Sequence, residues 1–307
     1  MFSQPICKQC HKPILGNYLT ALGTTWHPEH FVCTGCGRPL NSAKFTLHQD
    51  APYHMECYTN LVAPRCAYCH QPLVGEYLVD HWGTRYCRQH QHEYPVCDFC
   101  GRLVPPQEQE QGRNVESTRC ATCRSRAIET ATEAKPIFSR LIRWVNNQGL
   151  MYNNLHLNLE LCSRGRLADL LKSRASTHAL GATASSTYMR NGQVVRSEVS
   201  GVAVLQGLPS TLFQGVIVHE LGHVWLVVQG IQKLPPWAEE GFCELLSYRY
   251  YSEMNTPESL YHASCIARNT DCTYGEGFRR VRDFAESTGF PHLLEILRTT
   301  KRLPIHP

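Results

Sequence analysis

The sequence has no uninterrupted apolar stretch of 18 residues, and its N-terminus has no basic start followed by an apolar run. A membrane-spanning helix needs the first feature and a secretory signal needs the second. Even the apolar segment 216–228 is interrupted by His219, Glu220 and His223. We therefore expect a chain that does not span a membrane and that lies in the cytoplasm.

A long basic run is also absent, although the formal net charge of the 307 residues is +4. Twelve metal-bound thiolates and four zinc ions would together bring that charge to about zero. No recognition-helix pattern is present either, so nucleic-acid binding is not expected.

Cysteine is scarce after residue 123, where only Cys162, Cys243, Cys265 and Cys272 remain of the 16 in the chain. These four lack ligand spacing, and we predict that they are small core residues without chemistry. The other twelve lie in the first 123 residues, ten of them in five Cys-x-x-Cys pairs and the remaining two at Cys57 and Cys87. This asymmetry predicts small metal-binding modules followed by an ordinary globular domain, an α+β chain overall.

Each zinc site needs four ligands, and the pairs can be grouped into four such sets that use all twelve N-terminal cysteines. The predicted sets are Cys7, Cys10, His27 and His30; Cys33, Cys36, His54 and Cys57; Cys66, Cys69, Cys87 and His90; and Cys97, Cys100, Cys120 and Cys123. Closed four-ligand sites are structural, and metal binding replaces the core that such small modules cannot build. The alternative, paired disulfides, requires an oxidising compartment and leaves the four histidines at ligand spacing by accident.

The first module resembles a LIM domain. The residues that carry the resemblance are Cys7-x-x-Cys10, Trp26-His27-Pro28-Glu29-His30-Phe31-x-Cys33-x-x-Cys36 and His54-x-x-Cys57. His30 stands where LIM domains usually carry cysteine, and because an imidazole nitrogen also binds zinc we expect the site to survive. The predicted domains are a LIM domain over 1–62, a LIM-like domain over 63–127, and a third domain over 128–307.

The segment His219-Glu220-Leu221-Gly222-His223 carries the predicted chemistry of the third domain. Histidines at i and i+4 share one face of a helix, so both imidazoles can bind one zinc ion. Glu220 is offset around the helix, where it can take a proton from a metal-bound water that attacks a carbonyl. Pro209 before the segment and Gly230 after it mark the ends of the predicted helix.

A third metal ligand is available in the next predicted helix, which begins near Trp237. Glu239 and Glu240 are both candidates, and only one of two consecutive helical residues can face the metal. Glu244 lies one turn later, where it can hydrogen-bond a ligating histidine or remain a solvated surface residue.

Other parts of the third domain are predicted less directly. Tyr274 lies in a glycine-rich segment and is our candidate for stabilising the oxyanion, with aromatic packing as the alternative. Apolar spacing predicts a helix around 137–145, and alternation predicts a strand over 155–161. We expect a further strand over 194–205, at the edge of a sheet beside the cleft and able to pair with an extended peptide.

The whole pattern resembles the DA-one family of ubiquitin-regulated peptidases, which combine LIM and LIM-like domains with a gluzincin peptidase domain. The matching motifs are Val204-Leu205-Gln206-Gly207-Leu208-Pro209, His219-Glu220-x-x-His223-x-Trp225-Leu226, Glu239-Glu240-Gly241 and Tyr274-Gly275-x-Gly277-Phe278-Arg279. The resemblance implies that Glu240, before glycine, is the third zinc ligand. It also implies a zinc endopeptidase acting on selected proteins, with ubiquitin as activator, partner or part of the substrate.

Plant members of this family carry ubiquitin-interacting helices before the LIM domain, whereas here Cys7 begins the first zinc site. We therefore expect any ubiquitin contact to come from the zinc modules or the peptidase domain. The expected metal content is four structural zinc ions and one catalytic zinc ion. The competing hypothesis is a noncatalytic LIM adaptor. Glu220 favours the enzyme over the adaptor, because an adaptor has no need of a general base.

Overall fold

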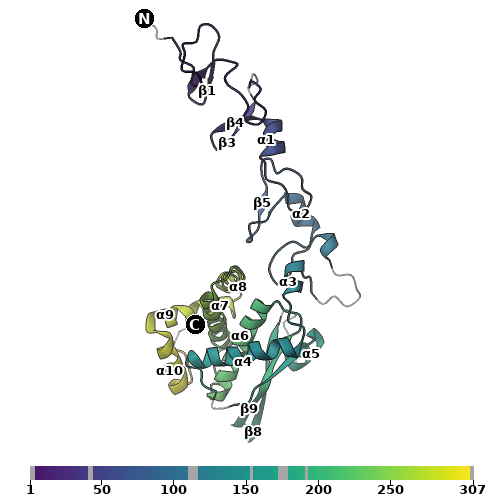
Figure 1. Ribbon diagram of the computed structural model, residues 1–307. Helices are drawn as coiled ribbons and strands as arrows, with labels where there is room; N and C mark the ends of the chain where they lie inside the picture. Colours follow the sequence, from purple (N-terminus) through teal and green to yellow (C-terminus); the bar gives the residue numbers. More distant parts are fainter. Residues whose placement is uncertain are drawn as a thin grey trace. The chain divides into compact units, whose positions relative to one another are not determined.

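The computed structural model describes residues 4–40, 44–109, 117–152, 155–171, 179–190 and 193–304. The chain forms two compact units, Met1–Pro95 and Val96–Pro307 (Figure 1). The domain boundaries expected from the sequence, after residues 62 and 127, stay predictions. The four-cysteine segment, predicted to be half of a LIM-like domain, lies within the second unit.

The first unit consists of short hairpins and single helical turns around its cysteine and histidine clusters. Its elements are β1 (Leu19–Ala21), β2 (Thr24–Trp26), β3 (Phe45–His48), β4 (Ala51–His54), α1 (Met55–Leu61), β5 (Leu78–Val79), β6 (Arg85–Tyr86) and α2 (Arg88–Glu93). The β1–β2, β3–β4 and β5–β6 pairs are antiparallel. A small core lies around Phe31 and Leu40, each 2% exposed, and the Trp26 ring packs 5.3 Å from that of Phe31. So little apolar burial is typical of modules that depend on a metal for stability.

The second unit begins with the four-cysteine segment and continues into a mixed helix and strand domain, which confirms the expected α+β class. Its elements are a 3-10 turn (Pro106–Glu108), α3 (Ala121–Ser125), α4 (Ala131–Asn147), β7 (Asn158–Cys162), α5 (Arg164–Leu171), β8 (Gly181–Arg190), β9 (Gln193–Leu205), α6 (Ser210–Val228), α7 (Pro236–Met254), α8 (Pro257–Arg268), α9 (Gly275–Thr288) and α10 (Phe290–Thr300).

The sheet of this unit has the order β7-β9-β8, with β7 parallel and β8 antiparallel to β9. The long β8–β9 hairpin is visible beside α6 in Figure 1. The predicted strand over 194–205 is therefore real, but its expected edge position is wrong, because β9 pairs on both sides. The edge strand beside α6 is β8, whose sequence Gly181–Arg190 is too rich in small polar residues to give a clear alternating pattern.

α6 is the central helix of the domain, and its ends follow the predicted signals. Pro209 caps its N-terminus, and Gly230 follows its C-terminal cap with a φ of +69°. An 18-residue window of α6 has a mean hydropathy of 1.3, high enough for a membrane span, yet 61% of the window is buried inside the protein. That burial is typical of a core helix, so the composition of α6 is weak support for a membrane span.

The segment that leaves the four-cysteine site is hydrogen-bonded to the chain just before α6. Ile128 N donates to Leu208 O and Gly207 N donates to Ile128 O, both at 2.9 Å. Ser210 N, in the first turn of α6, donates to Arg126 O at 2.9 Å. The first N–H groups of a helix have no partner within the helix, so this bond satisfies one of them.

α7 and α9 cross at two glycines that permit very close approach. A Cβ on Gly241 would lie 2.4 Å from the backbone of Gly277, and one on Gly277 would lie 2.1 Å from Trp237 O. These distances exclude any larger residue without displacement of a backbone. The crossing brings the start of α9, at Tyr274, towards the metal-binding face of α7.

Candidate metal centres and active site

The structure brings together each of the four N-terminal ligand sets predicted from sequence. Tetrahedral zinc with Zn–S bonds of about 2.3 Å places two thiolates about 3.8 Å apart. The sulfur atoms of Cys66 and Cys87 are 3.8 Å apart, and those of Cys69 and Cys87 are 3.9 Å apart. These clusters therefore have the composition and spacing of structural zinc sites.

His30, the departure from the usual LIM pattern, lies close to the other ligands of the first set. Its Nδ1 is 3.5 Å from Cys7 Sγ, and His27 Nδ1 is 3.4 Å from Cys10 Sγ. Burial acts to raise the pKa of the Cys7 thiol, but backbone N–H bonds, led by that of His27, outweigh it and lower the pKa to about 5. The thiolate form that binds metal is thus favoured.

The third set contains a buried histidine nitrogen that has no hydrogen-bond partner among the described residues. His90 is 5% exposed, and its Nε2 has no hydrogen-bond partner in the described part of the chain. Its Nδ1 lies 3.3 Å from Glu93 Oε2. An imidazole held by a carboxylate through one nitrogen, with the other directed at three cysteines, is typical of a zinc ligand.

A fifth cluster lies between α6 and α7. His219 Nε2 is 3.2 Å from His223 Nε2, and Glu240 Oε2 lies 3.2 Å from the former and 3.5 Å from the latter. Ligands at about 2.0–2.1 Å from a tetrahedral zinc ion lie about 3.3 Å apart, so these three donor atoms fit such an ion. Three protein ligands leave the fourth position open to water or substrate.

The outer nitrogen of each histidine also faces a carboxylate. His223 Nδ1 is 3.1 Å from Glu239 Oε1, and His219 Nδ1 is 3.6 Å from Glu244 Oε1. Burial acts to lower the pKa of His219, but Glu240 and Glu244 outweigh it, so the pKa is raised. This surplus of negative charge favours a cation between the histidines and fixes which nitrogen of each ring faces it.

Cys243 also approaches the two histidines, with its sulfur within 4.8 Å of a nitrogen of each. It is fully buried, and burial raises the pKa of its thiol to about 12. Glu240 Oε2 lies 3.2 and 3.5 Å from the two histidines, and despite its burial the hydrogen bonds from His219 and His223 hold the pKa of its carboxyl well below the usual range. Glu240 is therefore the better third ligand, and the small thiol fills the space beneath Gly222.

Glu220 is 6% exposed and lies one residue from His219, at the face of α6 that meets β8. Its Oε2 accepts a hydrogen bond from Thr183 Oγ1 at 2.8 Å. The buried Tyr152 also contacts α6, where its hydroxyl donates a hydrogen bond to Leu221 O at 2.9 Å. The carboxylate is thus beside the metal-ligand cluster without belonging to it.

Tyr274 immediately precedes α9 and is 38% exposed. Burial, followed by the charge of Glu240, raises the pKa of its phenol to about 12, so the hydroxyl keeps its proton at neutral pH. A protonated hydroxyl near the cluster has the chemistry of an oxyanion donor.

The four C-terminal cysteines divide into two pairs. Cys162 and Cys243 are buried, as predicted for small core residues. Cys265 and Cys272 are exposed, so that prediction is wrong for them. Cys265 lies in α8, and Cys272 lies between α8 and α9. Neither position has a ligand spacing or an apolar pattern that fixes the direction of its side chain.

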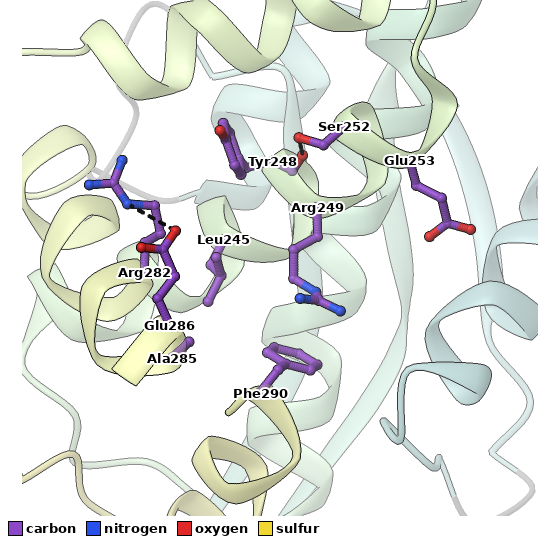
Figure 2. A pocket seen from close by; sticks show the side chains of 9 residues that line it. All are labelled: Leu245, Tyr248, Arg249, Ser252, Glu253, Arg282, Ala285, Glu286 and Phe290. Carbon is purple, nitrogen blue, oxygen red and sulfur yellow. Dashed lines mark hydrogen bonds and ion pairs between the residues drawn. The ribbon is translucent and has the colours of Figure 1, made fainter. Parts of the chain in front are cut away.

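A concavity of about 420 Å³ lies on a different face of α7, between α7, α9 and α10 (Figure 2). Its lining residues are Leu245, Tyr248, Arg249, Ser252, Glu253, Arg282, Ala285, Glu286 and Phe290. Arg282 and Glu286 face one another at 3.8 Å, and the Arg249 guanidinium lies 4.2 Å over the Phe290 ring. The lining includes neither the paired histidines nor Glu220.

Three residues of the site were not predicted to contribute to it. Glu239 was considered only as a competing metal ligand, although the need of a ligating histidine for an outer partner was a usable signal. Gly181 and Thr183 lie 37 or more residues before Glu220, on a strand that has no clear sequence signature. No local pattern could bring them to the site.

Comparisons with known proteins identify two parts of the chain. Residues 7–62 match a LIM domain family model, and residues 159–265 match a DA1-like model described as Protein DA1. The second match spans His219, Glu220, His223 and Glu240, but ends before Tyr274.

Similar whole proteins come from plants, and each alignment covers 98% of this chain. LIM domain-containing protein HDR3 of Oryza sativa subsp. japonica is 25% identical, with 74% of its length covered. Protein DA1-related 2 and Protein DA1 of Arabidopsis thaliana are 26% and 24% identical, with 70% and 68% of their lengths covered. The chain is thus a homologue of DA1 and the DA1-related proteins, in which N-terminal LIM zinc-binding modules precede a DA1-like domain.

Proposed function

We propose that this protein is a zinc-dependent endopeptidase that hydrolyses peptide bonds of selected protein substrates. The observation that carries the proposal is the convergence of His219 Nε2, His223 Nε2 and Glu240 Oε2 at 3.2–3.5 Å, with Glu220 next to His219 in the chain. This combination of two histidines, one glutamate and an adjacent free carboxylate is that of thermolysin-like zinc peptidases.

When bound by these ligands, zinc supplies a Lewis acid that polarises a carbonyl and makes water a better nucleophile. Glu220 takes the proton of the attacking water and returns it to the leaving amine, as general acid and base. Its low exposure of 6% keeps bulk water from competing for the carboxylate. Tyr274 donates a hydrogen bond to the oxyanion, because a tyrosine hydroxyl keeps its proton at neutral pH.

The edge strand β8 is the element to which we propose that an extended peptide substrate binds. It pairs with β9 on one side only within the described sheet, and its first residues lie against Glu220. A peptide that adds to its free edge would satisfy the backbone groups of both strands. Strand pairing uses the backbone groups of the substrate, which are the same in every peptide. We therefore propose that the zinc modules select the protein substrates.

Protein partners are proposed for those modules. Their described surface exposes large apolar side chains, among them Leu15 at 81% and Leu61 at 65%. Closed zinc modules commonly present binding surfaces rather than catalytic groups. We propose that ubiquitin or ubiquitinated proteins are among the partners and that the protein acts in the cytoplasm.

The test is hydrolysis of an unfolded protein by the wild type and by Glu220→Gln. The substitution keeps the shape of the side chain and removes its basicity, so we expect turnover to fall by at least about a hundredfold. Equal turnover by the two proteins would refute the peptidase proposal. Comparison of new N-termini in a cell extract, with and without added ubiquitin, would then identify substrates.

A further inference from the structure

The general base of the proposed reaction is held by a residue of the edge strand. Thr183 Oγ1 lies 2.8 Å from Glu220 Oε2 and 3.0 Å from the backbone oxygen of Glu220. A threonine hydroxyl has one proton, so it donates to one of these acceptors at a time. A hydrogen bond to a carboxylate is stronger than one to a neutral carbonyl, which favours the bond to Oε2.

The other oxygen of Glu220 lies against Gly181, two residues earlier on the same face of β8. A Cβ on Gly181 would lie 2.8 Å from Glu220 Oε1 and 2.9 Å from Glu220 Cγ. It would also lie 2.8 Å from Val216 Cγ1, one turn earlier on α6. A side chain at position 181 would therefore force the Glu220 carboxylate out of its place.

The position of both residues is fixed by the sheet. Gly181 pairs with Val204 and Thr183 with Val202, and Val202 and Val204 are 1% and 0% exposed. Side chains alternate between the faces of a strand, so residues 181 and 183 face the same way and lie opposite Glu220. A glutamate side chain has three rotatable bonds, and this contact removes much of its freedom before substrate binds.

We propose that Thr183 is a positioning residue that orients Glu220, and that Gly181 provides the space for the carboxylate it orients. This inference rests on the proposed peptidase function, because the carboxylate needs a fixed orientation only if it must meet a reacting proton. It also links the strand expected to receive the peptide to the group that acts on it. A base held within hydrogen-bond reach of the attacking water has a lower barrier than one that must first reorient.

The decisive variants are Thr183→Val, which keeps the shape and removes the hydroxyl, and Thr183→Ser, which keeps the hydroxyl. We expect Thr183→Val to lower kcat by about tenfold with KM within about twofold, since only the orientation of the base is changed. Thr183→Ser should restore kcat to within about threefold of the wild type. Zinc content and thermal stability, measured on the same samples, should be unchanged in both.

Ser200→Ala is the matched control, because the Ser200 hydroxyl bonds Ala184 O across the same pair of strands at 3.1 Å and does not contact Glu220. Its kinetics should be those of the wild type. A loss in Ser200→Ala equal to that in Thr183→Val would mean that the hydroxyls only stabilise the hairpin, and would overturn the inference.

A dipeptide hydroxamate provides a readout that does not require turnover. Such a compound binds a metal and donates its hydroxyl to a neighbouring base, so its affinity depends on where Glu220 points. Calorimetry should find affinity about fivefold lower in Thr183→Val and restored in Thr183→Ser. Unchanged affinity and unchanged kcat in Thr183→Val, with Glu220→Gln inactive, would reject the role of Thr183 and leave the peptidase proposal intact. If the wild type and Glu220→Gln hydrolyse substrate equally, the peptidase proposal fails instead.

Discussion

The cysteine site around Cys33 and Cys36 in the first unit and the four-cysteine site in the second begin with the same local structure. Gly37 and Gly101 each follow a Cys-x-x-Cys pair, with φ values of +70° and +73°. Gly37 N donates to Cys33 O at 2.8 Å, and Gly101 N donates to Cys97 O at 3.0 Å. The local chain is therefore shaped alike by its ligand spacing in both units.

What differs is the surroundings of the two sites. A Cβ on Gly37 would meet nothing within 4 Å, whereas one on Gly101 would lie 2.7 Å from the hydroxyl of Tyr261 in α8. All members of the four-cysteine site are buried, whereas Cys36 and Cys57 of the first unit are half-buried. The comparison teaches that one zinc-binding pattern serves either a self-contained surface module or an integral part of the domain that carries the candidate active site.

The largest difference between the two sites is expected when zinc ligands are removed from each in turn. Cys97→Ser with Cys120→Ser should unfold residues 96–127 and release the bonds from Arg126 and Ile128 that hold the start of α6. Structural zinc contributes on the order of 10 kcal/mol of apparent binding free energy, comparable with the whole stability of a domain. Hydrogen exchange should therefore rise sharply at residues 207–214, and peptide hydrolysis should be lost.

The matched change in the first unit is Cys33→Ser with Cys36→Ser. It should unfold its own module and leave hydrogen exchange in 207–214 as in the wild type. Equal exchange at the start of α6 in the two double variants would remove the distinction between the sites.

A smaller effect is expected from adding one methyl group at each equivalent glycine. Gly37→Ala and Gly101→Ala both place a side chain at a positive φ, which costs about 1 kcal/mol. Only Gly101→Ala also meets Tyr261, and such overpacking costs about 1–3 kcal/mol more. Denaturant unfolding of each unit, followed by hydrogen exchange, measures the difference. Equal losses at the two positions would mean that α8 does not pack tightly against the four-cysteine segment.

The smallest effect is expected from the ion pair between Arg126 and Glu258, which joins the same segment to α8. Their side chains are 53% and 29% exposed, so Arg126→Gln should cost no more than about 1 kcal/mol. The Arg126 guanidinium lowers the pKa of Glu258, so the stabilisation is present above the ordinary pKa of the carboxyl and is lost as pH falls through the lowered value. Thermal unfolding of the wild type and Arg126→Gln should accordingly converge on acidification. A difference in unfolding temperature that stays constant with pH would mean that Arg126→Gln destabilises the protein through lost packing and not through the lost ion pair.

The comparison also explains which features could be predicted from the sequence. The structural zinc ligands lie in short pairs, and α6 carries both histidines of the candidate active site one turn apart. Spacing along the sequence was therefore enough to group the ligands of each site. The packing of the four-cysteine segment with the rest of the second unit includes bonds that join Arg126 and Ile128 to residues some 80 positions away. No periodicity encodes such pairing. The edge position of β8 was missed for the same reason, because strand order is set by long-range packing rather than by the pattern within one strand.

The most direct test of the central claim is the zinc content of three purified proteins, determined by native mass spectrometry together with peptide hydrolysis. We expect five zinc ions in an active wild type, five in an inactive Glu220→Gln and four in an inactive Glu240→Gln, because Glu240 is a zinc ligand and Glu220 is not. A wild type with four zinc ions, or a Glu240→Gln protein that keeps both the fifth ion and full hydrolysis, would contradict the assignment of the candidate active site.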